Sequence, residues 1–187
     1  MTVAIFYATR EGHTRKIAQR IADDLRARGV SVAMFDVRKT RDVDWSIYSA
    51  AILAASVHVG HHEKEMIAFA RRYCSELTLI DAAFVSVTLS EAGAEDMRRP
   101  EPDRQRSAAD AQRMIDVFVD ETGWRPAHAL PVAGALAYTK YNFLVRFIMR
   151  RIARQAGAPT DTARDYELTD WPALDRFVER IAQQWRT

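Results

Sequence analysis

The chain has 187 residues, of which 48% are hydrophobic and 28% charged, as expected for one soluble domain. Its 27 basic and 25 acidic side chains leave a net charge of +2, too small to indicate a nucleic-acid partner. The single cysteine, Cys74, excludes a disulfide framework and a cysteine-based metal centre, and it suits a reducing cytoplasm. No apolar run reaches the ~18 residues of a membrane span. The chain starts in an apolar strand with no basic leader, so we expect no secretory signal.

Apolar runs of strand length alternate with amphipathic segments along the chain, a pattern typical of an α/β fold with a parallel sheet. Five strands are predicted, at residues 3–8, 30–35, 51–56, 83–89 and 129–135. Helices are predicted at residues 13–28, 63–76, 107–122 and 141–156, and after the capping residue Asp170. With the first strand central, we expect one doubly wound domain over residues 1–187, with strand order 2-1-3-4-5 and three α/β/α layers. In such sheets the ligand lies at the carboxyl ends of the strands.

Residues 90–106 interrupt this alternation. The segment contains Gly93, Pro100, Pro102 and many charges, and it is too long for an ordinary connection between a strand and a helix. We expect a long irregular loop there. Either it is a lid over the ligand, or it is a disordered surface excursion, and the sequence does not decide between them.

The loop after the first strand has the composition of a phosphate cradle. Gly12 lets the backbone approach a ligand, threonines supply hydroxyl groups, and the following helix directs its free N–H groups towards an anion. The alternative is a plain glycine-containing turn with a threonine cap. The chain lacks the glycine patterns of dinucleotide-binding and P-loop proteins. The residues of the predicted cradle are Thr9, Arg10, Glu11, Gly12, His13 and Thr14.

The motif Thr-x-x-Gly-x-Thr after the first strand resembles the FMN-phosphate loop of flavodoxins. Further stretches resemble one branch, the flavodoxin-type menaquinone-dependent protoporphyrinogen oxidases. These stretches are Ala55-Ser56-Val57, Gly60-His61, Ser86-Val87, Trp124-Arg125-Pro126, Gly134-Ala135-Leu136, Thr160-Asp161-Thr162 and Thr169-Asp170-Trp171. The resemblance covers nearly the whole chain in the right order. It implies a flavodoxin-like fold, FMN as cofactor, and oxidation of protoporphyrinogen IX to protoporphyrin IX in haem biosynthesis, with a membrane quinone as acceptor.

The resemblance also places the loops after the third and fourth strands beside the flavin ring. Chemistry of this kind is carried by the flavin, so no catalytic acid or base is assigned. The chain departs from the family at His58 and Val59, where Arg and Tyr often stand, and this leaves FMN retention open. Three nearby histidines could suggest a metal, but no acidic or cysteine ligand joins them, so none is predicted. The residues expected at the ring are Ser56, Val57, His58, Val59, Gly60, His61, Ser86, Val87, Thr88 and Leu89.

Positive charge is concentrated between Thr122 and Thr160, where no Asp or Glu occurs. In the amphipathic helix predicted at 141–156, Tyr141, Leu144, Val145, Ile148, Met149 and Ile152 share one face. Basic residues interleaved with phenylalanines on the other face suit an anionic membrane surface. The alternatives are a solvated face with its phenylalanines under neighbouring loops, or a macromolecular partner. The residues expected to face the membrane are Phe143, Phe147, Arg146, Arg150, Arg151 and Arg154.

These features together predict a cytoplasmic enzyme that is peripheral on the inner face of the cell membrane. The competing hypotheses are a flavodoxin-type electron carrier, an FMN-dependent quinone reductase with another donor, and a flavodoxin-like scaffold without flavin. A phosphoryl-accepting receiver domain is excluded, because Thr9 and Ser56 stand where that chemistry needs carboxylates. The sequence specifies neither the quinone nor the oligomeric state, and a homo-oligomer remains open.

Overall fold

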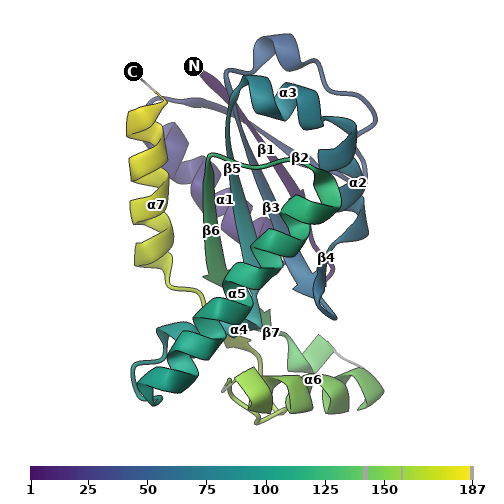
Figure 1. Cartoon of the computed structure of the whole chain (residues 1–187), viewed down its shortest axis with the longest axis vertical. Coiled ribbons are helices and arrows are strands. Elements are labelled where there is room, and N and C mark those ends of the chain that lie inside the picture. The colour runs from purple at the N-terminus through teal and green to yellow at the C-terminus, as the bar shows by residue number, and fades with distance from the viewer. Residues whose placement is uncertain (141–142, 157, 186–187) are drawn as a thin grey trace.

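A twisted sheet of five parallel strands forms the centre of the computed structural model, which describes residues 1–140, 143–156 and 158–185 (Figure 1). The strands run in the order β2-β1-β3-β5-β6, so the predicted order is confirmed. A two-residue strand, β4 (His61–His62), turns back antiparallel to the end of β3. The five parallel strands are β1 (Thr2–Ala8), β2 (Ser31–Asp36), β3 (Ala50–His58), β5 (Asp81–Thr88) and β6 (His128–Ala133).

Helices cover both faces of the sheet because successive strand residues point to opposite sides. Val3, Ile5 and Tyr7 of β1 join the core beneath α1 (His13–Ala27) and α7 (Trp171–Gln184). The alternate β1 residues pack with α2 (Lys64–Arg72), α3 (Cys74–Leu79) and α5 (Glu101–Thr122) on the other face. The helix predicted at 63–76 is therefore two helices, which meet at Tyr73. A short 3-10 helix, η1 (Trp45–Ile47), precedes β3.

The prediction of a long irregular loop over residues 90–106 is wrong. The segment holds a helix, α4 (Leu89–Glu95), and the first turns of α5, and only residues 96–100 connect them. Thr88 caps α4, since its hydroxyl accepts from the backbone N–H of Ser90. Pro102 lies in the first turn of α5, where a proline costs no hydrogen bond. The prolines that suggested a break therefore mark a helix start, and the segment is mostly helical instead of irregular or disordered.

The chain leaves the layered fold between β6 and α7, in a segment that we call the excursion (residues 134–168). It contains β7 (Ala135–Leu136), the 3-10 helix η2 (Tyr138–Lys140), α6 (Phe143–Ala156) and β8 (Tyr166–Glu167). Strands β7 and β8 pair antiparallel. A small third core forms within the excursion, around Leu136, Tyr138, Ala153 and Ala158.

Helix α6 lies across the end of the molecule towards which the parallel strands point, next to α4 (Figure 1). It therefore does not pack on a face of the sheet, although the sequence pattern predicted that it would. The helix predicted at 141–156 is present over Phe143–Ala156. Tyr141 and the side chains of Leu144, Val145, Ile148, Met149 and Ile152, which were predicted to form its inner face, lie outside what the structure describes.

Candidate functional site

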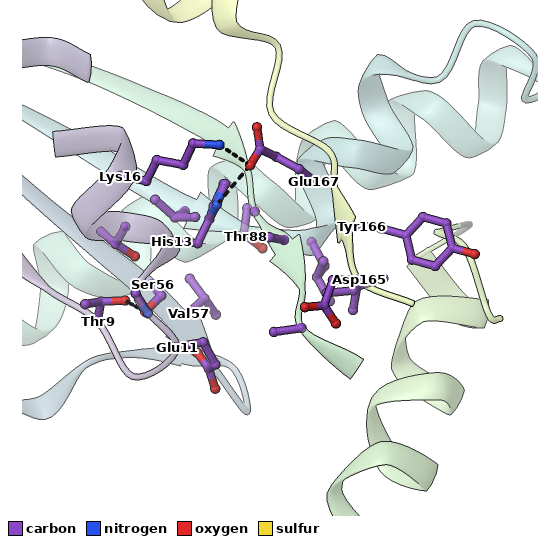
Figure 2. A pocket seen from close by; sticks show the side chains of 18 of the residues that line it. Thr9, Glu11, His13, Lys16, Ser56, Val57, Thr88, Asp165, Tyr166 and Glu167 are labelled. Atoms are coloured by element: carbon purple, nitrogen blue, oxygen red, sulfur yellow. Dashed lines mark hydrogen bonds and ion pairs between the residues drawn. The ribbon is translucent and has the colours of Figure 1, made fainter. Parts of the chain in front are cut away.

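A pocket of about 480 Å³ opens at the carboxyl ends of the parallel strands (Figure 2). One wall is the β1–α1 loop with the start of α1, and the floor includes the ends of β3 and β5. The opposite wall is the excursion, through residues 134–137 and 165–167. The pocket therefore lies at the edge of the sheet where ligands bind in doubly wound folds.

The β1–α1 loop forms a cradle at the N-terminus of α1. Gly12 adopts a left-handed backbone conformation with φ of 94°, which disfavours any residue with a Cβ atom. The Thr9 hydroxyl accepts from the Gly12 N–H at 3.0 Å and closes the turn. Thr14 is buried in the first turn of α1. The first N–H groups of a helix have no partner within it, so this end of α1 attracts an anion.

His13 links the cradle to the far side of the pocket. Its Nε2 lies 2.8 Å from the hydroxyl of Thr169, which itself donates to the carbonyl of Ala133 at 2.7 Å. Because the single hydroxyl proton is used on Ala133, Nε2 of His13 carries the proton and donates. Burial lowers the pKa of His13, in spite of the nearby Glu167 carboxylate. His13 is therefore neutral at pH 7 and serves to join the two walls.

A second link joins α1 to β8 at the mouth of the pocket. The Lys16 ammonium lies 2.5 Å from a carboxylate oxygen of Glu167 (Figure 2). The other oxygen of Glu167 accepts from the indole N–H of Trp171 at 2.9 Å. The hydrogen bond from Lys16 is the main cause of the lowered pKa of Glu167. Two links thus hold the excursion against the cradle.

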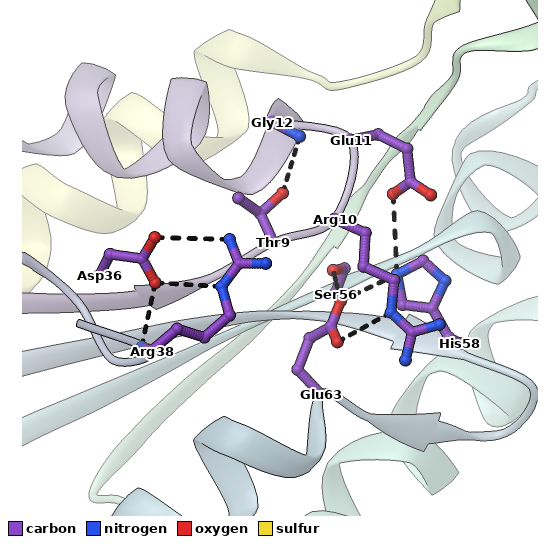
Figure 3. A network of polar contacts seen from close by, with 9 residues as sticks. All are labelled: Thr9, Arg10, Glu11, Gly12, Asp36, Arg38, Ser56, His58 and Glu63. Carbon is purple, nitrogen blue, oxygen red and sulfur yellow. Dashed lines mark hydrogen bonds and ion pairs between the residues drawn. The ribbon is translucent and has the colours of Figure 1, made fainter. Parts of the chain in front are cut away.

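A buried carboxylate connects the cradle with the end of β3 (Figure 3). Glu63 has a side chain only 4% exposed, and it accepts from the Ser56 hydroxyl and from Nε of Arg10, each at 3.1 Å. His58 Nε2 lies 3.0 Å from Glu63 and 3.7 Å from Glu11. Arg10 is therefore directed to Glu63, and it does not line the pocket.

The turn between β3 and β4 points away from the pocket. Val59 and Gly60 both have positive φ, of 51° and 81°, as in a two-residue type I′ hairpin turn. A positive φ is strained for a β-branched residue, and the Val59 side chain is 93% exposed. The His61 ring contacts Glu121 of α5 at 3.0 Å. Val59, Gly60 and His61 therefore do not line the pocket.

At the end of β5, a residue directed into the core is followed directly by residues that line the pocket. Val87, Thr88 and Leu89 line the pocket. Ser86 does not, because its hydroxyl is 2.9 Å from Nε2 of the buried His62. Burial lowers the pKa of His62 to about 3, so this ring is neutral.

Most of the residues predicted around the cofactor gather at this pocket. These are Thr9, Glu11, Gly12, His13, Thr14, Ser56, Val57, His58, Val87, Thr88 and Leu89. Their part in cofactor binding stays a prediction, and Arg10, Val59, Gly60, His61 and Ser86 lie around the pocket without lining it. Sequence reasoning missed Lys16, Gly134, Ala135, Leu136, Ala137, Asp165, Tyr166 and Glu167. Gly134-Ala135-Leu136 did carry the family resemblance, and a Cβ at Gly134 would lie 3.3 Å from Val87.

One face of α6 carries phenylalanine and arginine side chains that are exposed to solvent. The side chains of Phe143 and Phe147 are 85% and 67% exposed. Arg150, Arg151 and Arg154 are exposed too, and the spacing of all five residues places them on one helix face. Arg146 is half-buried and donates to the carbonyl of Tyr138.

Among the described residues, no helix is long and apolar enough to span a bilayer, and no cluster of His, Cys, Asp and Glu suits a metal ion.

The sheet order, the cradle and the pocket define a flavodoxin-like protein. A family model described as a flavodoxin domain matches residues 4–163, and the chain belongs to this family. The chain can also be superimposed on a short-chain flavodoxin associated with a bacterial microcompartment, with a TM-score of 0.53 over 99% of both chains. The identity to that flavodoxin is 15%, so this likeness shows the fold alone.

Two curated relatives carry a more particular name, protoporphyrinogen IX dehydrogenase (quinone). The relative from Escherichia coli K12 is 29% identical over 182 residues, which cover 97% of this chain and 95% of its own length. The relative from Leishmania major is 28% identical, over 95% of this chain and 73% of its own. The resemblance to quinone-dependent protoporphyrinogen oxidases is thereby confirmed.

Proposed function

We propose that this protein is an FMN-dependent oxidoreductase that oxidises protoporphyrinogen IX to protoporphyrin IX and passes the electrons to a quinone. The observation that carries the proposal is the cradle of Thr9, Gly12 and Thr14, which opens into the pocket at the carboxyl ends of β3 and β5. The names of the full-length relatives support the substrate and the acceptor. Haem biosynthesis is the pathway that this reaction would serve.

The residues of the pocket fit a flavin mononucleotide. The N–H groups at the start of α1 and the threonine hydroxyls would hold the phosphate, and Gly12 leaves space beside them that a Cβ would enter. Val57, Val87 and Leu89 supply apolar surface for a flat ring. The flavin would accept two electrons as a hydride and return them to the quinone. The chain would position the ring and orient the substrate. The wall formed by residues 134–137 would keep water away from the ring.

A flavin titration tests the cofactor. Purified protein should be yellow, and both Gly12→Val and Thr14→Arg should weaken FMN binding at least tenfold, through backbone strain in the first and a filled cradle in the second. Gly29→Val is the matched control, because Gly29 also has a positive φ, of 79°, but caps the far end of α1. A colourless protein that does not bind added FMN would leave the scaffold hypothesis in place.

An anaerobic assay of porphyrinogen oxidation with menadione as acceptor tests the reaction. Turnover that requires both FMN and the quinone would support the proposed enzyme. A protein that binds FMN but does not oxidise porphyrinogen would instead be an electron carrier or a quinone reductase with another donor.

We also propose that the exposed face of α6 docks on the inner face of the cell membrane. Aromatic and arginine side chains on one face of a helix suit the boundary between water and anionic lipid. Each arginine near such a surface contributes ~1 kcal/mol, and a buried phenylalanine contributes ~1.5–3 kcal/mol. The placement of α6 beside the strand ends would bring the pocket close to a quinone dissolved in the bilayer.

Flotation with vesicles of phosphatidylglycerol and phosphatidylcholine tests this docking. The pair Phe143→Ser and Phe147→Ser should lower the bound fraction at least fivefold. The matched control is Ile47→Ser with Leu79→Ser, two exposed apolar residues that precede the starts of β3 and β5, whereas the pocket lies at the carboxyl ends of these strands. Equal recovery of both double variants would contradict the proposal.

A further inference from the structure

His58 lies in the pocket wall between two carboxylates, an arrangement that phosphate binding does not require. Its Nε2 is 3.0 Å from Glu63 Oε1 and 3.7 Å from Glu11 Oε2 (Figure 3). This nitrogen is buried and meets Glu63 at ion-pair distance without the geometry of a hydrogen bond, so the contact is electrostatic, whereas the residue as a whole lines the pocket. Nδ1 is therefore the nitrogen that a ligand in the pocket can reach.

Glu63 is held so that it can orient this ring. The Ser56 hydroxyl and Arg10 Nε each donate to one of its oxygens, and its own backbone N–H donates to the carbonyl of Ser56. Burial by itself would raise the pKa of Glu63, but His58 and Arg10 outweigh burial and lower it. Glu63 is thus an ionised, nearly inaccessible carboxylate at neutral pH. A carboxylate in such a position selects the Nε2–H tautomer and stabilises the positive charge of a protonated ring.

We propose that His58 accepts a proton from the substrate through Nδ1 and that Glu63 is its positioning residue. This inference rests on the proposed function and assigns a role within it. Each two-electron oxidation removes a hydride from a methylene bridge of the porphyrinogen and a proton from a pyrrole N–H. The hydride would leave with the C–H electron pair to a bound flavin, which supplies the two-electron acceptor, and the nitrogen lone pair would form the new double bond. The N–H electron pair stays on nitrogen as its proton passes to Nδ1.

The charged groups facing His58 favour this transfer. Glu11 and Glu63 both lie on the Nε2 side, and Arg10, which contacts Glu63, offsets one of these two negative charges. The ring therefore gains its positive charge next to a group of charges that is negative by one. His61, which follows three residues later, contacts Glu121 on α5 and has no access to the pocket.

Three variants test the assignment: His58→Gln, Glu63→Gln and, as the matched control, His61→Gln. His58→Gln should bind FMN within about threefold of the wild type and lose about a hundredfold in kcat, as is usual when a general base is removed. Glu63→Gln should lose about tenfold in kcat. In the nitrogen-15 spectrum of Glu63→Gln, the neutral ring of His58 should lose its preference for the Nε2–H tautomer, because a neutral amide no longer attracts a proton to that nitrogen. His61→Gln should match the wild type.

Nitrogen-15 NMR of the wild-type imidazoles gives a readout independent of turnover. Neutral His58 should carry its proton on Nε2, with or without FMN, and an Nδ1–H tautomer would overturn the proposal. So would an unchanged kcat in His58→Gln, in which case the proposed function would still stand. A wild-type chain that binds FMN but oxidises no porphyrinogen would overturn the proposed function, and this assignment with it.

Discussion

At the scale of single residues, neighbouring histidines in one short segment have entirely different environments. His58 lies between carboxylates in the pocket wall, His61 contacts a helix at the surface, and His62 is buried against Phe84 and Phe118. His61 and His62 differ because successive strand residues point to opposite sides, whereas His58 and His61 are cross-strand partners and differ in the residues next to each ring. The sequence identified the cluster as a candidate site, but only the hairpin shows which ring faces the pocket.

His62 should make the protein sensitive to acid. Its pKa is about 3 when folded and near 6.5 when unfolded, so the unfolded chain binds the extra proton between these values. Stability is therefore lost as pH falls from 6.5 towards 3, with a slope of up to about 1.4 kcal/mol per pH unit. Urea unfolding between pH 4.5 and 7.5 should show a shallower dependence for His62→Asn than for the wild type. His61→Asn is the control, and equal slopes in wild type and His62→Asn would contradict the prediction.

At the scale of elements, helix ends explain both the successes and the one large error of the sequence prediction. The stop of α1 at Gly29 and the start of α7 at Asp170 follow from local signals, and both are observed. The start of α5 carries a local signal too, with Pro102 at a position that tolerates proline and acidic residues in the first turn. Such a signal is ambiguous in sequence, because a proline also marks loops. The packing of α4 against α5 decides it.

The hydrogen bond by which Asp170 caps α7 can be tested separately from the negative charge of Asp170. Asp170 Oδ1 accepts from the Ala173 N–H at 2.9 Å. Burial raises the pKa of Glu95 to about 7, with smaller contributions from Glu91 and from the Asp170 carboxylate. Asp170→Ala should lose ~1 kcal/mol of stability, as expected for a lost cap. Asp170→Asn keeps the cap and removes the repulsion, so at pH 8 it should be at least as stable as the wild type. Urea unfolding measures both, and an equal loss in the two variants would assign the effect to charge.

At the scale of the whole molecule, the chain consists of a layered fold and an excursion that completes its pocket. The two large cores lie on either side of the sheet, and the third is confined mainly to the excursion. The net charge of +2 averages over an uneven distribution, since the acid-free stretch from 122 to 160 includes α6 at one end of the molecule. The positive charge and the exposed phenylalanine rings therefore lie on the same helix, α6, beside the pocket.

Removal of α6 should separate folding from membrane docking. In a variant with residues 138–164 replaced by Gly-Ser-Gly-Ser, β7 and β8 can still pair through a short turn. This variant should keep the far-UV circular dichroism of the sheet and a cooperative urea transition, because its two main cores are intact. It should no longer float with anionic vesicles. A shortened chain that floats like the wild type would place membrane docking elsewhere.

The sequence by itself determined the strand order, most helices and the glycine turn at the start of α1, because these depend on periodicity and on signals a few residues apart. The far wall of the pocket, the orientation of His58 and the position of α6 were decided only by the tertiary structure. They depend on contacts such as His13 with Thr169 and Arg10 with Glu63, whose partners are distant in sequence. No local pattern encodes such pairs, since a side chain selects its partner only when folding brings the two together.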